Sequence, residues 1–118
     1  MKQEDEASKS AAISRYAAMF TAMGAEPRLR ILRLLLSAHP EGLVVGEILE
    51  ALNIAASTLS HHLEKLKIHD LITVERKRTF LRYRANIRTL QELLSFMYAE
   101  CCTRSKAIEP EQIVTIRK

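Results

Sequence analysis

The residues of this 118-residue chain with the most distinctive chemistry are two adjacent cysteines, Cys101 and Cys102. Two neighbouring thiols can bind one soft, sulfur-preferring ion. They can also serve a redox switch through a disulfide, although adjacent cysteines close only a strained ring. The simplest alternative is that Cys101 is a small apolar residue packed in an interface. Their adjacency excludes the disulfide framework of a small secreted domain.

Histidine and hydroxyl side chains form the second candidate group, in the run Ser57-Thr58-Leu59-Ser60-His61-His62. On a helix, the two histidines point about 100° apart and therefore cannot converge on one metal ion. Contact with DNA, or packing, explains them better than zinc ligation. The chain has no glycine-rich phosphate loop and no plausible Ser/His/Asp set, so we do not expect an enzyme.

A helix over residues 55–72 would hold this second group in place. Leu59, Leu63 and Leu66 recur with helical spacing and predict a buried stripe. Short hydrogen-bonding side chains on the opposite face, at the leading end, suit close approach to base edges in a DNA major groove. The candidate DNA contacts on this helix are Ser57, Thr58, Ser60, His61, His62 and Lys65.

The positive charge of the chain is concentrated on this helix and the segment after it. Seven basic and three acidic residues lie between Ser57 and Arg84, which accounts for the whole net charge of +4. This distribution is expected of a phosphate-binding surface, although a solvated basic face is the alternative. The β-prone runs 71–75 and 80–84 predict a hairpin whose tip lacks the glycine or asparagine of tight turns. Its candidate phosphate contacts are Arg76, Lys77, Arg78 and Arg82.

Apolar spacing and helix-stop residues predict the remaining elements. We expect a polar lead-in over residues 1–10, helices over 11–23, 27–38, 44–52 and 87–104, and a tail over 105–118. Leu29 and Leu36 are among the core candidates of the second helix. Two short helices, a turn, a helix with a polar outer face and a hairpin make a winged helix-turn-helix. The predicted fold is therefore mainly α with a small β-hairpin, in one domain over residues 11–104.

At this point the chain resembles the ArsR family of bacterial metalloid- and metal-responsive repressors. The resemblance covers residues 11–104 and is carried by EPRLRIL at 26–32, STLSHHL at 57–63 and RYR at 82–84. It implies a homodimer formed by the first and last helices, with paired recognition helices reading an inverted repeat in double-stranded operator DNA. Wide apolar stripes on those two helices agree with this. The expected interface residues are Ile13, Tyr16, Phe20, Leu90, Leu94, Met97 and Tyr98.

At most of the positions where family members hold inducing ions, this chain lacks the ligating residues. The cysteine motif of some members would fall on residues 44–48, where neither cysteine position is a cysteine, and the last helix lacks the histidine of the zinc-binding type. This weakens zinc, cadmium and nickel as inducers. The pair Cys101 and Cys102 resembles the C-terminal cysteine pairs of some arsenic-responsive members, which favours a metalloid-binding role.

Two thiolates complete the coordination of trivalent arsenic when carbon occupies the third valence. We therefore expect methylarsenite or another organoarsenical as the regulatory ligand of Cys101 and Cys102, with no permanent cofactor. Arsenite or antimonite would need a third thiol, from the partner subunit or glutathione, and remains an alternative, as does thiol oxidation. Two influences on the thiols oppose each other, because the helix C-terminus disfavours thiolate whereas Arg104 and Lys106 favour it.

The chain carries no apolar run of membrane-spanning length, and its first ten residues are polar and acidic, unlike a secretion signal. We therefore expect a cytoplasmic protein with no membrane partner, whose thiols stay reduced.

Overall fold

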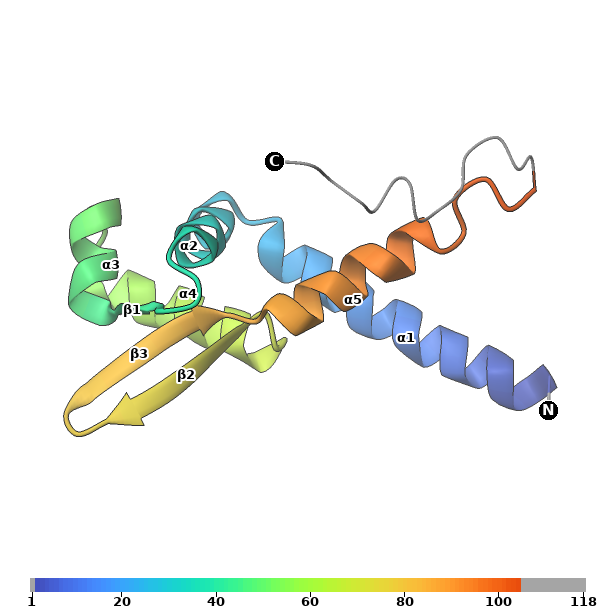
Figure 1. The fold of residues 1–118 in the computed structure, drawn as a ribbon, viewed down its shortest axis with the longest axis horizontal. Coiled ribbons are helices and arrows are strands. Elements are labelled where there is room, and N and C mark those ends of the chain that lie inside the picture. The colour runs from blue at the N-terminus through green and yellow to red at the C-terminus, as the bar shows by residue number, and fades with distance from the viewer. Residues whose placement is uncertain (1, 105–118) are drawn as a thin grey trace. The chain divides into compact units, whose positions relative to one another are not determined.

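The computed structural model describes residues 2–104, so the predicted tail over 105–118 lies outside the described residues. The fold is a winged helix-turn-helix, mainly α with a small sheet, which confirms the predicted fold class (Figure 1). The chain divides after Asn86 into two compact units. The elements are α1 (Lys2–Met23), α2 (Glu26–Ser37), β1 (Leu43–Val44), α3 (Val45–Leu52), α4 (Ala56–Ile68), β2 (Ile72–Lys77), β3 (Phe80–Ala85) and α5 (Ile87–Tyr98).

Helix α1 begins at Lys2, so the predicted polar lead-in over residues 1–10 is wrong from that residue onward. Its first turns are rich in lysine, glutamate, glutamine and alanine, which favour helix without forming an apolar stripe. Apolar periodicity therefore missed a helical segment that residue propensity favours.

The core of the first unit is built from α1, α2, α3, α4 and the start of the hairpin. Leu59, Leu63 and Leu66 are buried, so α4 uses the apolar stripe that its sequence predicts. In α2, Leu29 and Leu36 are 44% and 39% exposed, and their predicted place in the core is wrong. They lie about 100° around the helix from the centre of the face that carries the buried residues. Those buried residues are Ile31, Leu32 and Leu35.

A three-stranded antiparallel sheet in the order β1-β3-β2 supports the wing. Strand β1 was not predicted, and Val44, which we expected in the third helix, is its second residue. Tyr83 pairs with Leu43 on one side and Val74 on the other. Gly42 just before β1 has φ +76°, and an added Cβ would stand 2.4 Å from the Tyr83 carbonyl oxygen. Only glycine allows this close approach of β1 to β3.

In the second unit, α5 ends at Tyr98, so the prediction that the last helix reaches residue 104 is wrong. The amide of Cys101 donates to the carbonyl of Tyr98 (2.9 Å), which is a turn hydrogen bond three residues back rather than four. Cys102 then takes a left-handed conformation, φ +62°. The apolar spacing continues through Cys101 although the helical hydrogen bonding does not.

Among the described residues, no helix combines the length and the apolar character needed to cross a membrane.

Candidate nucleic-acid interface

Helix α4 presents an exposed polar face at its N-terminal end. Its first turn carries no acidic residue, and Ala55 before it provides no side-chain cap. The first amide groups of the helix are therefore open to an outside acceptor, and the local charge does not oppose a phosphate. The predicted DNA contacts that lie exposed on α4 are Ser57, Thr58, Ser60, His61 and Lys65.

His62 differs from the other predicted contacts because it is only half exposed and lies against α2. Its Nδ1 is 3.4 Å from Nη1 of Arg28. Burial, followed by the positive charges of Arg28 and His61, lowers the pKa of His62 below its ordinary value. The sequence did hold a signal for this position, because His62 stands three residues after Leu59 and four before Leu66, on the edge of the apolar stripe.

The wing is the hairpin of β2 and β3, which projects from the helices of the first unit (Figure 1). Lys77 pairs with Phe80, so Arg78 and Thr79 form the turn. Arg78 has φ +57°, as the first central residue of a type II′ turn requires. This residue takes the place where glycine is usual, which resolves the turn that the sequence left uncertain. Arg76, Lys77 and Arg78 are all exposed.

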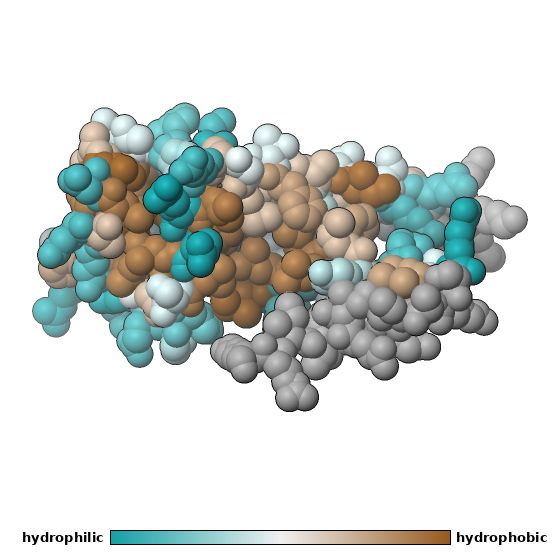
Figure 2. Space-filling view, turned by 90° about the horizontal axis from the view of Figure 1, so that it is seen from above, coloured by the Kyte–Doolittle hydropathy of each residue, from teal (hydrophilic) through white to brown (hydrophobic). Residues whose placement is uncertain are grey.

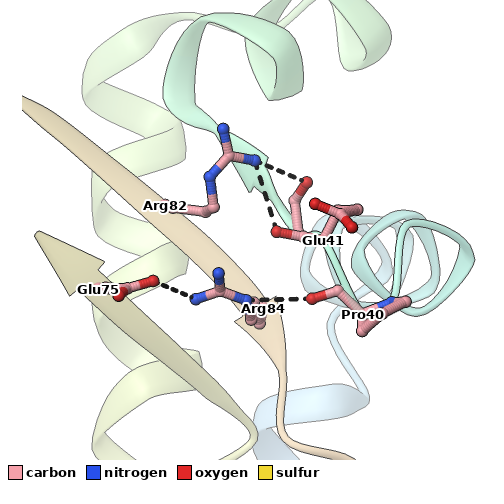
Figure 3. Close-up of polar contacts among 6 residues, drawn as sticks. Pro40, Glu41, Glu75, Arg82 and Arg84 are labelled. Carbon is pink, nitrogen blue, oxygen red and sulfur yellow. Dashed lines mark hydrogen bonds and ion pairs between the residues drawn. The ribbon is translucent and has the colours of Figure 1, made fainter. Parts of the chain in front are cut away.

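Arg82, a predicted phosphate contact, is engaged inside the protein at its Nη1 atom. This atom donates to the carbonyl oxygens of Glu41 (3.4 Å) and Gly42 (3.2 Å) (Figure 3). Arg82 as a whole residue is half exposed, and it lines a cavity of about 530 Å³ together with Lys77 and Arg78. Arg82 therefore links the wing to the loop before β1 through hydrogen bonds, and the residue remains partly accessible to solvent.

Arg84 makes the matching anchor two residues along the same strand face. Its Nε donates to the carbonyl of Pro40 (3.1 Å) and its Nη1 donates to Glu75 Oε1 (2.8 Å) (Figure 3). This hydrogen bond, together with the charge of Lys77, lowers the pKa of the Glu75 carboxyl. Sequence reasoning gave Arg84 no such role, although its spacing from Arg82 in a strand was the available signal.

Cys101 and Cys102 lie in the turn after α5, both free and both half-buried. Their Sγ atoms are 3.2 Å apart. The hydrogen bond between the thiols, followed by burial, raises the pKa of Cys101 above its ordinary value. In the described part of the chain, no three histidine, cysteine or acidic side chains gather as metal ligands would.

Both helices that we expect at the dimer interface, α1 and α5, carry strongly exposed apolar side chains. Ile13 and Phe20 on α1 are 56% and 41% exposed, and Leu94 and Met97 on α5 are 46% and 54% exposed. Figure 2 shows hydrophobic residues, in brown, reaching the surface among hydrophilic ones, in teal. The remaining predicted interface residues, all half-buried, are Tyr16, Leu90 and Tyr98.

Comparison with known proteins assigns this architecture to a family. The helix-turn-helix domain family matches residues 23–75, from the end of α1 into β2. The transcriptional repressor SdpR of Bacillus subtilis is 34% identical over 79 residues, which are 67% of this chain and 84% of SdpR. A homodimeric winged helix-turn-helix DNA-binding domain of Mycobacterium bovis, described as a possible ArsR-family regulator, shares the fold. It has a TM-score of 0.63 and 24% identity, over 86% of this chain and 91% of its own.

The chain belongs, with SdpR, to the winged helix-turn-helix transcriptional regulators.

A third protein similar to this regulator is reduced HlyU from Vibrio cholerae. It is 30% identical, with a TM-score of 0.59, over 80% of this chain and 98% of HlyU. The relatives are described as transcriptional regulators, which agrees with the expectation of a regulator. In this regulator, α4 is the second helix of the helix-turn-helix, which is the position of a recognition helix, and the β2–β3 hairpin is the wing.

Proposed function

We propose that the protein is a dimeric repressor that leaves its operator when a trivalent arsenical binds Cys101 and Cys102, with methylarsenite or another organoarsenical as the favoured inducer. The observation that carries this proposal is the 3.2 Å separation of two free Sγ atoms. One soft atom can contact both sulfurs at that distance. Two sulfurs and one carbon then fill the three valences of arsenic, with no further protein ligand required.

The DNA-bound state would use both α4 and the wing of the first unit. In a homodimer, such as the one described for the Mycobacterium bovis relative, two α4 helices about 34 Å apart would read an inverted repeat. Ser57, Thr58, Ser60 and His61 would contact bases. The basic wing residues would hold phosphates and supply most of the salt-dependent affinity. In this arrangement His62 contributes through its packing against Arg28.

Release would begin in the turn after α5. An arsenic atom bound by both thiols would fix the geometry of this turn and of the end of α5, which we assign to the dimer interface. A change at the interface alters the spacing of the two recognition helices, and a coupling of about 1–3 kcal/mol lowers DNA affinity roughly 5- to 150-fold. Each arsenic–sulfur bond would form as one hydroxyl group of methylarsenite leaves with the thiol proton as water. The raised pKa of Cys101 keeps that proton on the thiol before binding.

A redox response through the same cysteines is the second candidate. Two thiols this close can be oxidised to a disulfide, and one relative was solved in a form described as reduced. Arsenite or antimonite with a third, external thiol remains the other variant of the sensor. All three mechanisms place the signal at Cys101 and Cys102 and the response at α4.

The deciding experiment is fluorescence anisotropy on an operator duplex selected from a random library. The bound complex is titrated with methylarsenite, arsenite, antimonite, zinc and peroxide. Methylarsenite should release the native protein at the lowest concentration, with one arsenic bound per subunit. Cys101→Ser and Cys102→Ser should bind the duplex normally and stay bound. Glu100→Gln in the same turn is the matched control that keeps both thiols and should respond as the native protein does.

Release by zinc without release by arsenicals would overturn the proposed cysteine site. Release by peroxide alone, reversed by dithiothreitol, would favour the redox mechanism. If neither cysteine variant changes any response, the protein is a DNA-binding dimer that does not use these thiols.

A further inference from the structure

A basic pocket lies behind the recognition helix, where α1, α2 and α4 of the first unit meet. Its volume is about 340 Å³, and its lining residues are Ala18, Thr21, Ala22, Arg28, Lys65 and His69. Arg28 comes from α2, whereas Lys65 and His69 come from the second half of α4 and its C-cap. The pocket therefore gathers nitrogen donors from two elements of the helix-turn-helix.

Arg28 is held in a fixed position. Its Nε donates to the carbonyl oxygen of Ala22 at the end of α1 (2.7 Å), and its Nη1 lies 3.4 Å from the Nδ1 of His62. The second terminal nitrogen, Nη2, has no hydrogen-bond partner among the described residues. A guanidinium oriented in this way is prepared to bind an oxyanion with little further loss of side-chain freedom.

The positive charge of the pocket is not neutralised by the part of the protein that the structure describes. No carboxylate lines the pocket there. Lys65 and His69 make no side-chain hydrogen bond or ion pair with another described residue, whereas Lys67 on the same helix pairs with Glu64 (3.5 Å). The charge of Arg28 is also felt at His62, where it contributes to a lowered pKa. Basic side chains that converge without an acidic partner repel one another unless an anion joins them.

We propose that this pocket binds a phosphate group, held by the guanidinium of Arg28, the ammonium of Lys65 and the imidazole of His69. Three nitrogen donors, one from α2 and two from α4 and its C-cap, match the several oxygens of a phosphate. The volume exceeds that of a lone phosphate ion and leaves room for a substituent. Two sources share this chemistry, namely a free phosphate compound and a phosphate of the DNA backbone. Only the second source rests on the proposed operator binding.

The site has a mechanical consequence for α4. A phosphate bound here bridges the second half of the recognition helix to Arg28, which is itself bonded to the end of α1. It therefore braces α4 against the helices that support it. A free phosphate compound would act as a ligand of the folded state, whereas a DNA phosphate would fix the angle at which α4 meets the duplex.

The first test uses inorganic phosphate and the full chain without DNA. Thermal unfolding is followed as phosphate replaces chloride at constant ionic strength and pH, and ³¹P line broadening reports binding directly. The native protein should show a saturable rise in melting temperature, and Lys65→Gln should weaken the binding at least tenfold. Lys67→Gln removes the same charge from the same helix outside the pocket and should retain the native response. Circular dichroism verifies that both variants fold.

The second test uses operator duplexes in which single phosphates are replaced by neutral methylphosphonates. If a backbone phosphate occupies the pocket, one replacement should weaken the native protein about tenfold and leave Lys65→Gln unaffected, while Lys67→Gln loses affinity as the native protein does. Binding of inorganic phosphate without this DNA effect assigns the pocket to a free phosphate compound. Equal behaviour of Lys65→Gln and Lys67→Gln in both tests overturns the proposal. Neither result depends on whether arsenicals release the DNA.

Discussion

At the residue scale, His62 and Arg28 are two side chains that can both carry a positive charge. The Nδ1 of His62 lies 3.4 Å from the Nη1 of Arg28. The pKa of His62 is lowered in the folded protein, chiefly by burial and then by Arg28. Between the lowered pKa and the ordinary value of about 6.5, the unfolded chain binds more protons than the folded one. The contribution of His62 to the free energy of unfolding is therefore fully present above about pH 6.5 and is lost as the pH falls through the pKa of His62 in the folded protein.

We expect the free energy of unfolding in urea to decrease from about pH 7.5 to about pH 5, and His62→Gln to flatten this dependence. His39→Gln, at an exposed position after α2, is the matched control and should keep the native profile. Carboxylates such as Glu75, whose pKa is lowered by Arg84, contribute their own loss only at lower pH. Identical profiles for the native protein and His62→Gln would show that the ring charge is not coupled to folding.

Substituting Gly42 and Gly46 by alanine should change the stability of the protein in opposite directions. At Gly42, φ is +76° and a Cβ would meet the backbone of Tyr83 at 2.4 Å, so Gly42→Ala should destabilise the protein by about 1–3 kcal/mol. At Gly46, within α3, nothing lies within 4 Å, so Gly46→Ala should stabilise it by about 0.5–1 kcal/mol. Urea denaturation measures both changes. An equal effect at the two positions would contradict the assigned role of Gly42 in joining β1 to β3.

At the element scale, apolar spacing predicted where a helix packs better than where it begins or ends. The stripe of Leu59, Leu63 and Leu66 identified α4 because burial and spacing coincide there. Strand β1 has two residues, and its pairing with Arg82 and Tyr83 depends on a contact some forty residues away along the chain, which no local pattern contains. The end of α5 was missed for another reason, since Cys101 continues the apolar spacing beyond the last helical hydrogen bonds.

The candidate DNA interface was predictable in its elements and less so in the roles of individual side chains. Serine, threonine and lysine on the outer face of α4 are exposed as their spacing predicts. Arg82 and Arg84, in contrast, bond to carbonyl groups of the loop before β1, which has no recognisable partner signal in the sequence. The identity of an arginine predicts that it will find hydrogen-bond acceptors, but the fold decides which ones.

The tip of the wing is expected to contact DNA phosphates through Arg78. Arg78 is exposed in the turn of the hairpin, so Arg78→Ala should weaken binding to all DNA sequences and reduce the salt slope of log Kd by about one. Arg33→Ala removes the same charge from the exposed side of α2 and should leave the slope nearly unchanged. Titrations at four salt concentrations, on operator and on random duplex, measure both. A native slope for Arg78→Ala would show that the tip does not contact phosphate.

At the scale of the whole molecule, the proposed input and output lie in different units of the chain. The cysteines follow α5 in the second unit, whereas α4 and the wing belong to the first. A signal can pass between such units when both take part in one symmetric assembly, because a two-fold interface fixes the distance between two recognition helices. The dimer is therefore the part of the proposal on which the arsenical response and operator recognition both depend.

The last prediction tests that dependence. Phe20 on α1 and Met97 on α5 are 41% and 54% exposed, and covering the exposed part of either one in a dimer would contribute about 0.7–1.5 kcal/mol. Phe20→Glu and Met97→Glu replace that gain with a buried charge, and should raise the dissociation constant of the dimer at least about a hundredfold. Analytical ultracentrifugation measures this constant, and circular dichroism verifies the fold.

Phe80→Glu makes the same kind of change at a 61% exposed position on the wing and should sediment as the native dimer. The α1 and α5 variants should also lose the preference for an inverted repeat over a single half-site, since a monomer carries one recognition helix. Native dimerisation of both variants would remove α1 and α5 from the interface. The route by which a ligand at Cys101 and Cys102 could reach α4 would then have to run within one subunit.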